Sequence, residues 1–285
     1  MPAIPTIRRR MLGVELRALR EGLGHTADEM AQRLGWHQTK VSRIENGRSG
    51  VRLNELEAML DLYGLTDIEV REGLVNLVKE GKGRMWWTPY ADVLAERYAS
   101  YIALETEASS KRTYEMTLIP GLLQTPGYTR AVISALTPGA RPEVVDALVN
   151  VRLARQSATL RRAVPLNLWA VVDEAGLRRS IGGAQVMLKQ LQHLLEASEE
   201  PNITVQVLPF ASGGHAGLMG SFTILQFAIR NDLDVVYTES DVSNIRLERQ
   251  SDLATYSQVF DKLHAAALSV ASSRKFILHV VKDLQ

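Results

Sequence analysis

The 285-residue sequence contains no cysteine. Disulfides, cysteine-ligated zinc, iron–sulfur clusters and thiol catalysis are therefore excluded, and the composition suits a reducing cytoplasm. No apolar run approaches the ~18 residues that a membrane-spanning helix needs. The first residues also lack the continuous apolar segment of a secretion signal. We therefore expect a cytoplasmic, nucleoid-associated protein with no membrane partner.

Patterns typical of enzymes are also absent. The six histidines are scattered without metal-ligand spacing, and no Walker loop, G-x-G-x-x-G or G-x-S-x-G occurs. The glycines around His215 could cradle phosphate, but a strand-connecting loop explains them better. Adjacent acids at Asp173 and Glu174 are typical of a helix start, where the dipole favours negative charge. We expect no enzymatic activity, no metal and no cofactor.

Charge is distributed unevenly along the chain. The net charge is +1, yet the first 50 residues hold nine Lys and Arg against five acids. A small basic unit on a slightly acidic body is typical of a polyanion-binding protein. Solvated surface charge would explain the same count, so the local sequence pattern has to distinguish the two.

Apolar residues at helical spacing predict five short helices before residue 80. Thr26 to Glu29 form a T-x-x-E capping box that begins the second helix. Gly35 ends it, and the third helix runs from His37 to Asn46. Two short helices joined by a glycine turn, within a small basic bundle, indicate a helix-turn-helix. Residues 8–80 therefore form a mainly α DNA-binding domain.

The outward face of the third helix is polar and holds no acid. Any amphipathic surface helix has a polar outer face, but that does not explain why this one is rich in amides and cations. Gln can pair with adenine and Arg with guanine in the major groove of double-stranded DNA. The predicted DNA-binding residues are Gln38, Thr39, Lys40, Arg43, Asn46, Arg48, His37, Thr26 and Arg10. Further phosphate or minor-groove candidates are Arg8, Arg9 and Arg52.

The segment LGHTADEMAQRLGWHQTKVSRIENGR resembles the lambda-repressor-like (Xre-type) helix-turn-helix, over about residues 10–65. The resemblance implies that Gln38, Thr39 and Arg43 contact bases. It also implies a buried ion pair between Arg20 and Glu45 that joins the first and third helices.

Two positions depart from that family's pattern. Many relatives have Gln after the cap of the second helix, where it contacts phosphate, but here the residue is Ala27. The third helix usually begins with Ser or Thr. His37 is a poorer cap, so we expect it to contact phosphate instead.

Gly81-Lys82-Gly83-Arg84 predicts a linker over residues 81–87, and residues 88–285 then form a larger α+β (mixed α/β) domain. We expect helices over about 88–111, 127–136, 142–160, 183–197 and 248–269, with a helical turn at 174–179. The expected strands are 115–119, 166–172, 203–208, 222–227 and 235–238, and a last apolar stretch lies near 276–281.

This second part resembles the C-terminal domain of WhiJ-like actinomycete regulators, over about residues 85–275. The motifs that carry the resemblance are IPGLLQTPGYTRAV, VRLARQ, WAVVDEAGLRR, VLPFASGGHAGLMGSF and VVYTE. The resemblance implies a regulator linked to development and antibiotic production. Such proteins are often encoded beside a small partner protein and have been likened to antitoxins.

Polar and aromatic residues of the second part suggest a pocket for a small-molecule effector. The candidate ligand-binding residues are Gln124, Arg152, Arg155, Glu174 and Trp87. The alternative is a structural network in which Arg152 or Arg155 pairs with Glu174 or Glu105.

We therefore expect a sequence-specific transcriptional regulator. Two half-sites lie about one DNA turn, ~34 Å, apart, so we expect a homodimer. Its larger domain would supply dimerisation and sensing of a ligand or partner. The alternative is an antitoxin-like protein that binds a small partner encoded nearby and autoregulates its operon.

Overall fold

The computed structural model describes residues 7–80, 86–228, 233–239 and 244–285. Contacts divide the chain into two compact units. One contains the first five helices together with residues 95–107, and the other contains residues 89–94 and 108–285. The domain boundaries predicted from the sequence assign residues 95–107 to the larger domain instead. These boundaries stay a prediction. Residues 81–85 of the predicted linker lie outside the described residues.

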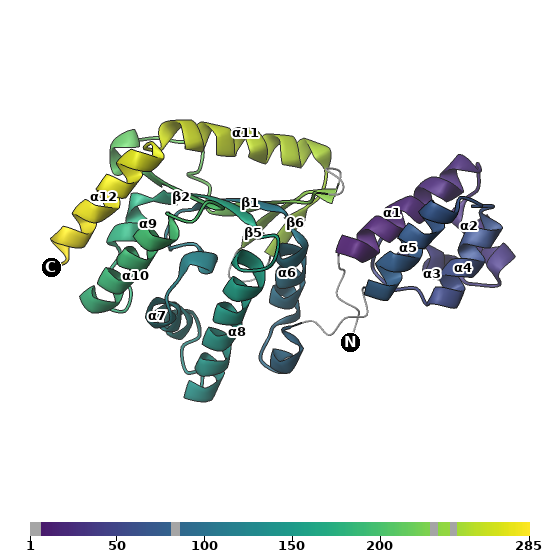
Figure 1. Ribbon diagram of the computed structural model, residues 1–285, viewed down its shortest axis with the longest axis horizontal. Coiled ribbons are helices and arrows are strands. Elements are labelled where there is room, and N and C mark those ends of the chain that lie inside the picture. The colour runs from purple at the N-terminus through teal and green to yellow at the C-terminus, as the bar shows by residue number, and fades with distance from the viewer. Residues whose placement is uncertain (1–6, 81–85, 229–232, 240–243) are drawn as a thin grey trace. The chain divides into compact units, whose positions relative to one another are not determined.

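The smaller unit contains the five predicted helices (Figure 1). They are α1 (Ile7–Gly22), α2 (Ala27–Leu34), α3 (Gln38–Glu45), α4 (Leu53–Leu62) and α5 (Ile68–Glu80). Each helix contributes an apolar stripe to one core, in which Leu16, Met30 and Leu56 are fully buried. This packing leaves the opposite face of each helix for solvent or a partner.

The long helix predicted over 88–111 is wrong. Residues 88–90 form a short 3-10 helix, η1 (Thr88–Tyr90), and the α-helix α6 (Glu96–Glu107) begins only later. Pro89 disfavours helical backbone at the residue before it. At the other end, residues from Ser110 pair with strands on both sides, and this sheet pairing overrides the helical pattern.

The larger unit is built on a six-stranded mixed sheet with the order β3-β2-β1-β4-β5-β6. β1, β2 and β3 run parallel, whereas β4, β5 and β6 add antiparallel pairs. The strands are β1 (Ser110–Glu115), β2 (Asn167–Asp173), β3 (Ile203–Leu208), β4 (Phe222–Gln226), β5 (Val235–Glu239) and β6 (Asn244–Leu247). The predicted fold class, a helical domain followed by an α+β domain, is confirmed.

Helices cover both faces of this sheet. In Figure 1, α11 (Gln250–Ala266) lies along one face, and α7 (Pro126–Leu136), α8 (Pro142–Leu160) and α10 (Ala184–Ala197) lie on the other side. Phe260 and Leu263 of α11 pack on Tyr114 and Phe222 of the sheet. The remaining elements are η2 (Gly121–Leu123), α9 (Glu174–Arg178), η3 (Phe210–Ser212) and α12 (Val270–Asp283).

Candidate nucleic-acid interface

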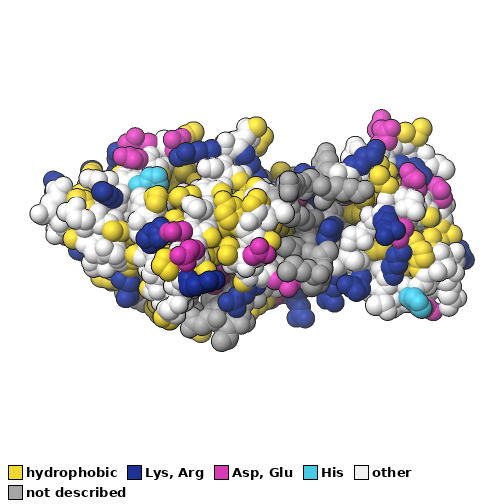
Figure 2. Space-filling view, turned by 90° about the horizontal axis from the view of Figure 1, so that it is seen from below, with side chains coloured by type: hydrophobic (Ala, Val, Ile, Leu, Met, Phe, Trp, Pro, Cys, Tyr) yellow, Lys and Arg dark blue, Asp and Glu magenta, His cyan; other side chains and the backbone are white. Residues whose placement is uncertain are grey.

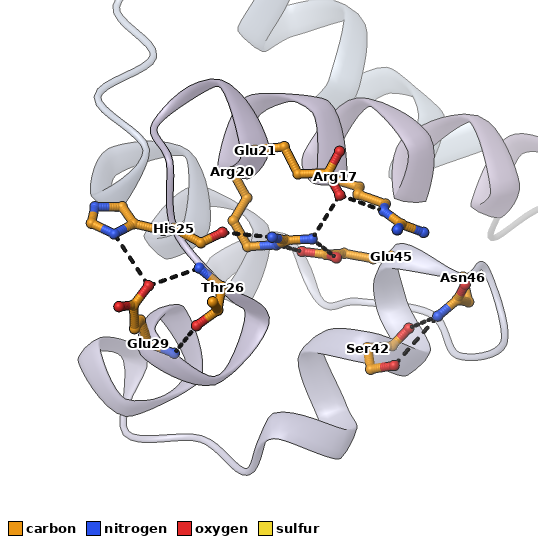
Figure 3. Close-up of polar contacts among 9 residues, drawn as sticks. All are labelled: Arg17, Arg20, Glu21, His25, Thr26, Glu29, Ser42, Glu45 and Asn46. Atoms are coloured by element: carbon orange, nitrogen blue, oxygen red, sulfur yellow. Dashed lines mark hydrogen bonds and ion pairs between the residues drawn. The ribbon is translucent and has the colours of Figure 1, made fainter.

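The turn between α2 and α3 has the predicted geometry. Thr26 Oγ1 accepts a hydrogen bond from the Glu29 N–H at 3.2 Å, and the Glu29 carboxylate accepts from the Thr26 N–H at 2.8 Å (Figure 3). Gly35 ends α2 with a φ of 67°, and its N–H donates back to Ala31 O and Gln32 O. The capping box and the glycine turn are therefore confirmed, and together they set the direction of α3.

A buried ion pair joins α1 to α3, as the resemblance implied. Arg20 Nε and Nη2 donate to the two Glu45 carboxylate oxygens at 2.7 and 2.9 Å, and Nη1 donates to His25 O at 2.6 Å (Figure 3). Arg20 is 7% exposed and Glu45 is 6% exposed. The hydrogen bonds that Arg20 donates to Glu45 raise the pKa of the guanidinium, although burial opposes this shift. Glu45 therefore holds α3 in place and does not face solvent.

Close backbone packing reinforces this contact. A Cβ added at Gly13 of α1 would lie 2.4 Å from Glu45 O, so only glycine fits between the two helices. Gly47, with a φ of 66°, packs on the Cα and Cγ of Arg10 in the same way. Val41 and Ile44 turn inward and are buried. One side of α3 is thereby fixed, and the other is left on the surface.

Three predicted base-contacting side chains lie on that surface. Gln38, Thr39 and Arg43 are all exposed. Within the described part of the chain, none of these three side chains makes a hydrogen bond or ion pair with another residue. The only acid of α3 is the buried Glu45. The exposed face of α3 is therefore acid-free and has donors and acceptors ready for a partner.

Other predicted DNA-binding residues have contacts within the protein. Asn46 Nδ2 donates to Ser42 O at 2.7 Å and to Ser42 Oγ at 3.3 Å, so the Asn46 amide folds back on its own helix (Figure 3). Lys40 Nζ lies 2.8 Å from Glu55 Oε1. The Thr26 hydroxyl is occupied by its cap hydrogen bond. These three assignments stay predictions, with protein contacts that DNA would have to share or displace.

The remaining predicted residues differ in exposure. His37 is the exposed N-cap of α3 and makes no side-chain cap hydrogen bond. Arg48 is exposed, and its N–H donates to Arg43 O at 2.8 Å. Arg10, by contrast, is only 7% exposed. The structure therefore places Arg10 in the packing between α1 and the end of α3 rather than at the surface. Figure 2 shows Lys and Arg side chains, with a histidine, on the surface of the smaller unit.

Three of the predicted ligand-binding residues come together in the larger unit, around η2. Gln124 is buried, and its Oε1 accepts from Arg152 Nη1 at 2.6 Å while its Nε2 donates to Ile119 O at 2.7 Å. A Cβ added at Gly121 would lie 3.4 Å from Arg155 Nη1. Gln156 completes the cluster by donating to Gly121 O and Gln124 O. These contacts fix the loop around η2, and the ligand pocket and the network of Arg152 or Arg155 with Glu174 or Glu105 both stay predictions.

The other two predicted ligand residues are not shown in that cluster. Glu174 Oε1 accepts from Arg178 Nε at 2.6 Å, and its other oxygen accepts from the Phe210 N–H at 2.8 Å. Trp87 is buried and packs edge-on against Trp86, with ring centroids 5.4 Å apart. Trp87 also belongs to the smaller unit by contacts. The five-residue pocket therefore stays a prediction.

The glycine-rich stretch connects β3 to β4, as expected from the sequence. A Cβ added at Gly217 would lie 2.5 Å from the ring of Tyr114, so this glycine packs directly on the ring. The Gly217 N–H donates to His215 Nδ1 at 3.1 Å. Asp173 caps α9 by accepting from the Ala175 N–H at 2.9 Å. The glycine-rich loop and Asp173 therefore both have structural roles.

Comparison with known proteins gives two family matches in different parts of the chain. Among the described residues, no helix is long and apolar enough to cross a membrane. Neither the curated proteins nor the solved structures contain a match. Residues 11–73 match the model of a helix-turn-helix domain. Residues 98–279, more than half of the chain, match the model of a domain of unknown function, DUF5753. The chain therefore belongs to the DUF5753 family and carries a helix-turn-helix domain before that domain.

Proposed function

We propose that this protein is a sequence-specific, DNA-binding transcriptional regulator that inserts α3 into the major groove. The observation that carries the proposal is the contrast between the two sides of α3. One side is fixed to α1 through Arg20 and Glu45, and the other presents Gln38, Thr39 and Arg43 to solvent. An α-helix fits the major groove, where amide and guanidinium groups can distinguish bases.

The exposed side chains favour base readout over nonspecific phosphate binding. Gln38 and Thr39 lie at the N-terminal end of α3, which is the part of a recognition helix that approaches base edges. Arg43 lies one turn further along and can reach guanine. Since Gln38 and Thr39 are uncharged, a purely electrostatic contact would not require them.

We further propose that the protein binds DNA as a homodimer, with the larger domain holding the two copies together. The support is geometric: α3 spans eight residues, so one copy reads only one half-site. A sensory input, from a small molecule or a partner protein, would act through the same domain. The resemblance of this domain to WhiJ-like regulators supports a sensory role. That role stays a prediction.

A second candidate function is the antitoxin-like binding of a small partner protein. The observation that favours it is a set of exposed apolar side chains between β3 and β4. Phe210, Leu218 and Met219 are 58%, 59% and 99% exposed. Exposed apolar groups that cluster can mark a protein interface. Co-purification of the neighbouring gene product, lost on replacing Leu218 and Met219 by Ser, would support this function.

Selection of duplexes from a random library tests the main proposal. Fluorescence anisotropy on the selected duplex should give a Kd at least about 10³-fold lower than on an unrelated duplex of the same length. Absence of any sequence preference would refute the regulator function.

A further inference from the structure

Lys40 lies in a contact that no local sequence pattern indicated. Its ammonium is 2.8 Å from Glu55 Oε1 of α4. The same ammonium lies 3.8 Å from the centre of the Trp36 ring, in the turn before α3. Three segments, the turn, α3 and α4, therefore meet at one lysine.

Glu55 is itself fixed by the start of its own helix. Its second carboxylate oxygen accepts a hydrogen bond from the Arg52 N–H at 2.9 Å. The hydrogen bonds from Lys40 and from the Arg52 N–H lower the pKa of Glu55, so the carboxylate is ionised at neutral pH. A negative charge therefore stands permanently opposite Lys40.

The position of Lys40 differs from that of the exposed residues on α3. Its side chain is 40% exposed, and a carboxylate and an aromatic ring already surround the ammonium. A phosphate would have to share the ammonium of Lys40 with these two groups or displace them, and displacing them would leave the Glu55 carboxylate uncompensated beside a polyanion. Binding a phosphate therefore costs more free energy at Lys40 than at Arg43. The side chain of Arg43 has no protein partner in the described part of the chain.

We propose that Lys40 is a positioning residue and makes no contact with DNA. By bridging Trp36 and Glu55, it fixes the N-terminal end of α3 relative to α4, so that Gln38 and Thr39 face the bases in one orientation. This inference rests on the proposed function, and it replaces the expectation that Lys40 reads bases.

The test uses the full chain with Lys40→Met, Glu55→Gln and both together. Anisotropy on the selected duplex and on an unrelated duplex is measured over a series of KCl concentrations. If Lys40 positions α3 through its contact with Glu55, each single variant weakens specific binding by about twofold to fivefold, as expected for one half-exposed ion pair. The double variant loses no more than either single variant. The slope of log affinity against log salt stays unchanged, because no phosphate contact is lost.

A direct contact between Lys40 and phosphate predicts different changes in the salt slope and in affinity. If Lys40 contacts phosphate, Lys40→Met reduces the salt slope by about one. Glu55→Gln then strengthens binding, because Lys40 is released from its competitor. Either result overturns the inference and leaves the proposed function intact. Failure of the unmodified chain to prefer any duplex refutes the proposed function itself, and the inference with it.

Lys79→Met, at an exposed lysine of α5, is the matched control. It should leave affinity and sequence preference unchanged. An equal loss in this control would show that net charge alone weakens binding, and it would also overturn the inference. Circular dichroism at the assay temperature verifies that each variant remains folded.

Discussion

Two arginines of the helix-turn-helix domain show how burial separates structural from functional side chains. Arg20 donates to Glu45 and to His25 O, and it is 7% exposed. Arg43 is exposed and has no recorded side-chain partner among the described residues. From the sequence alone, both arginines count equally as positive charge of the basic domain. Only Arg43 has a guanidinium group available to a ligand.

Replacing Arg43 by Ala should weaken binding to the selected duplex by about 1–3 kcal/mol and relax preference at one base pair, because one bidentate contact is lost. Anisotropy on duplexes carrying each base at every position measures both effects. Arg17→Ala, which removes a guanidinium from α1, is the control and should change neither. Equal weakening on all duplexes would instead identify Arg43 as a phosphate contact.

At the residue scale, local contacts could be predicted and distant ones could not. The capping box depends on residues three apart, so the spacing of Thr26 and Glu29 was sufficient. Lys40 and Glu55 lie fifteen residues apart on different helices. Helical periodicity placed Lys40 on the outer face, but it contains no information about a partner in α4. The burial of Arg10 against Gly47 likewise depends on tertiary packing.

Among the elements, α3 depends on its attachment to α1. Glu45→Gln should lower the free energy of unfolding of the smaller unit by about 2–4 kcal/mol, because the buried guanidinium of Arg20 loses its counter-charge. Urea unfolding followed by far-ultraviolet circular dichroism measures the loss. Glu21→Gln removes an exposed carboxylate beside the same arginine and should cost little. Equal costs in the two variants would contradict the account.

Strand β1 carries a carboxylate whose ionisation opposes folding. Burial is the largest cause of a rise in the pKa of Glu115 from 4.5 to about 7; Lys111 opposes this rise, and nearby Glu239 contributes to it. The folded state therefore prefers the protonated form. The contribution of Glu115 to stability is fully present below pH 4.5 and is lost as pH rises through 7.

Glu115→Gln should remove this pH dependence, because the amide has no proton to lose. The variant should exceed the unmodified chain in free energy of unfolding at pH 8 by about 1–3 kcal/mol, and the difference should shrink by pH 5. Urea titrations at both pH values measure it. Parallel pH profiles for the two proteins would show that Glu115 titrates normally.

Elements with a strong periodic or β-branched pattern were predictable. Ile203–Leu208 was expected as a strand and forms β3 with the same bounds. β1 was predicted too late, because Lys111 and Arg112 do not resemble a buried strand. Arg112 is half-buried because it lies over the Phe260 ring of α11, a tertiary contact that the local sequence does not indicate. β6, a short segment with a charged residue, was not predicted at all.

At the scale of the whole molecule, the proposed dimer predicts a steep salt dependence. If each copy neutralises about three to five phosphates, the slope of log affinity against log salt should be near −5 to −9. Sedimentation should show two copies on a duplex with two half-sites. A slope near −1, or a single copy bound at one half-site, would contradict dimeric binding.

The central claim, that α3 lies in the major groove, is tested most directly by methylation interference on the selected duplex. Dimethyl sulfate modifies guanine N7 in the major groove and adenine N3 in the minor groove. We predict that N7 methylation at guanines in both half-sites abolishes binding. Methylation of adenine N3 within the same half-sites should leave binding intact. Binding that tolerates every N7 methyl group would contradict a recognition helix that contacts guanines of the major groove through Arg43.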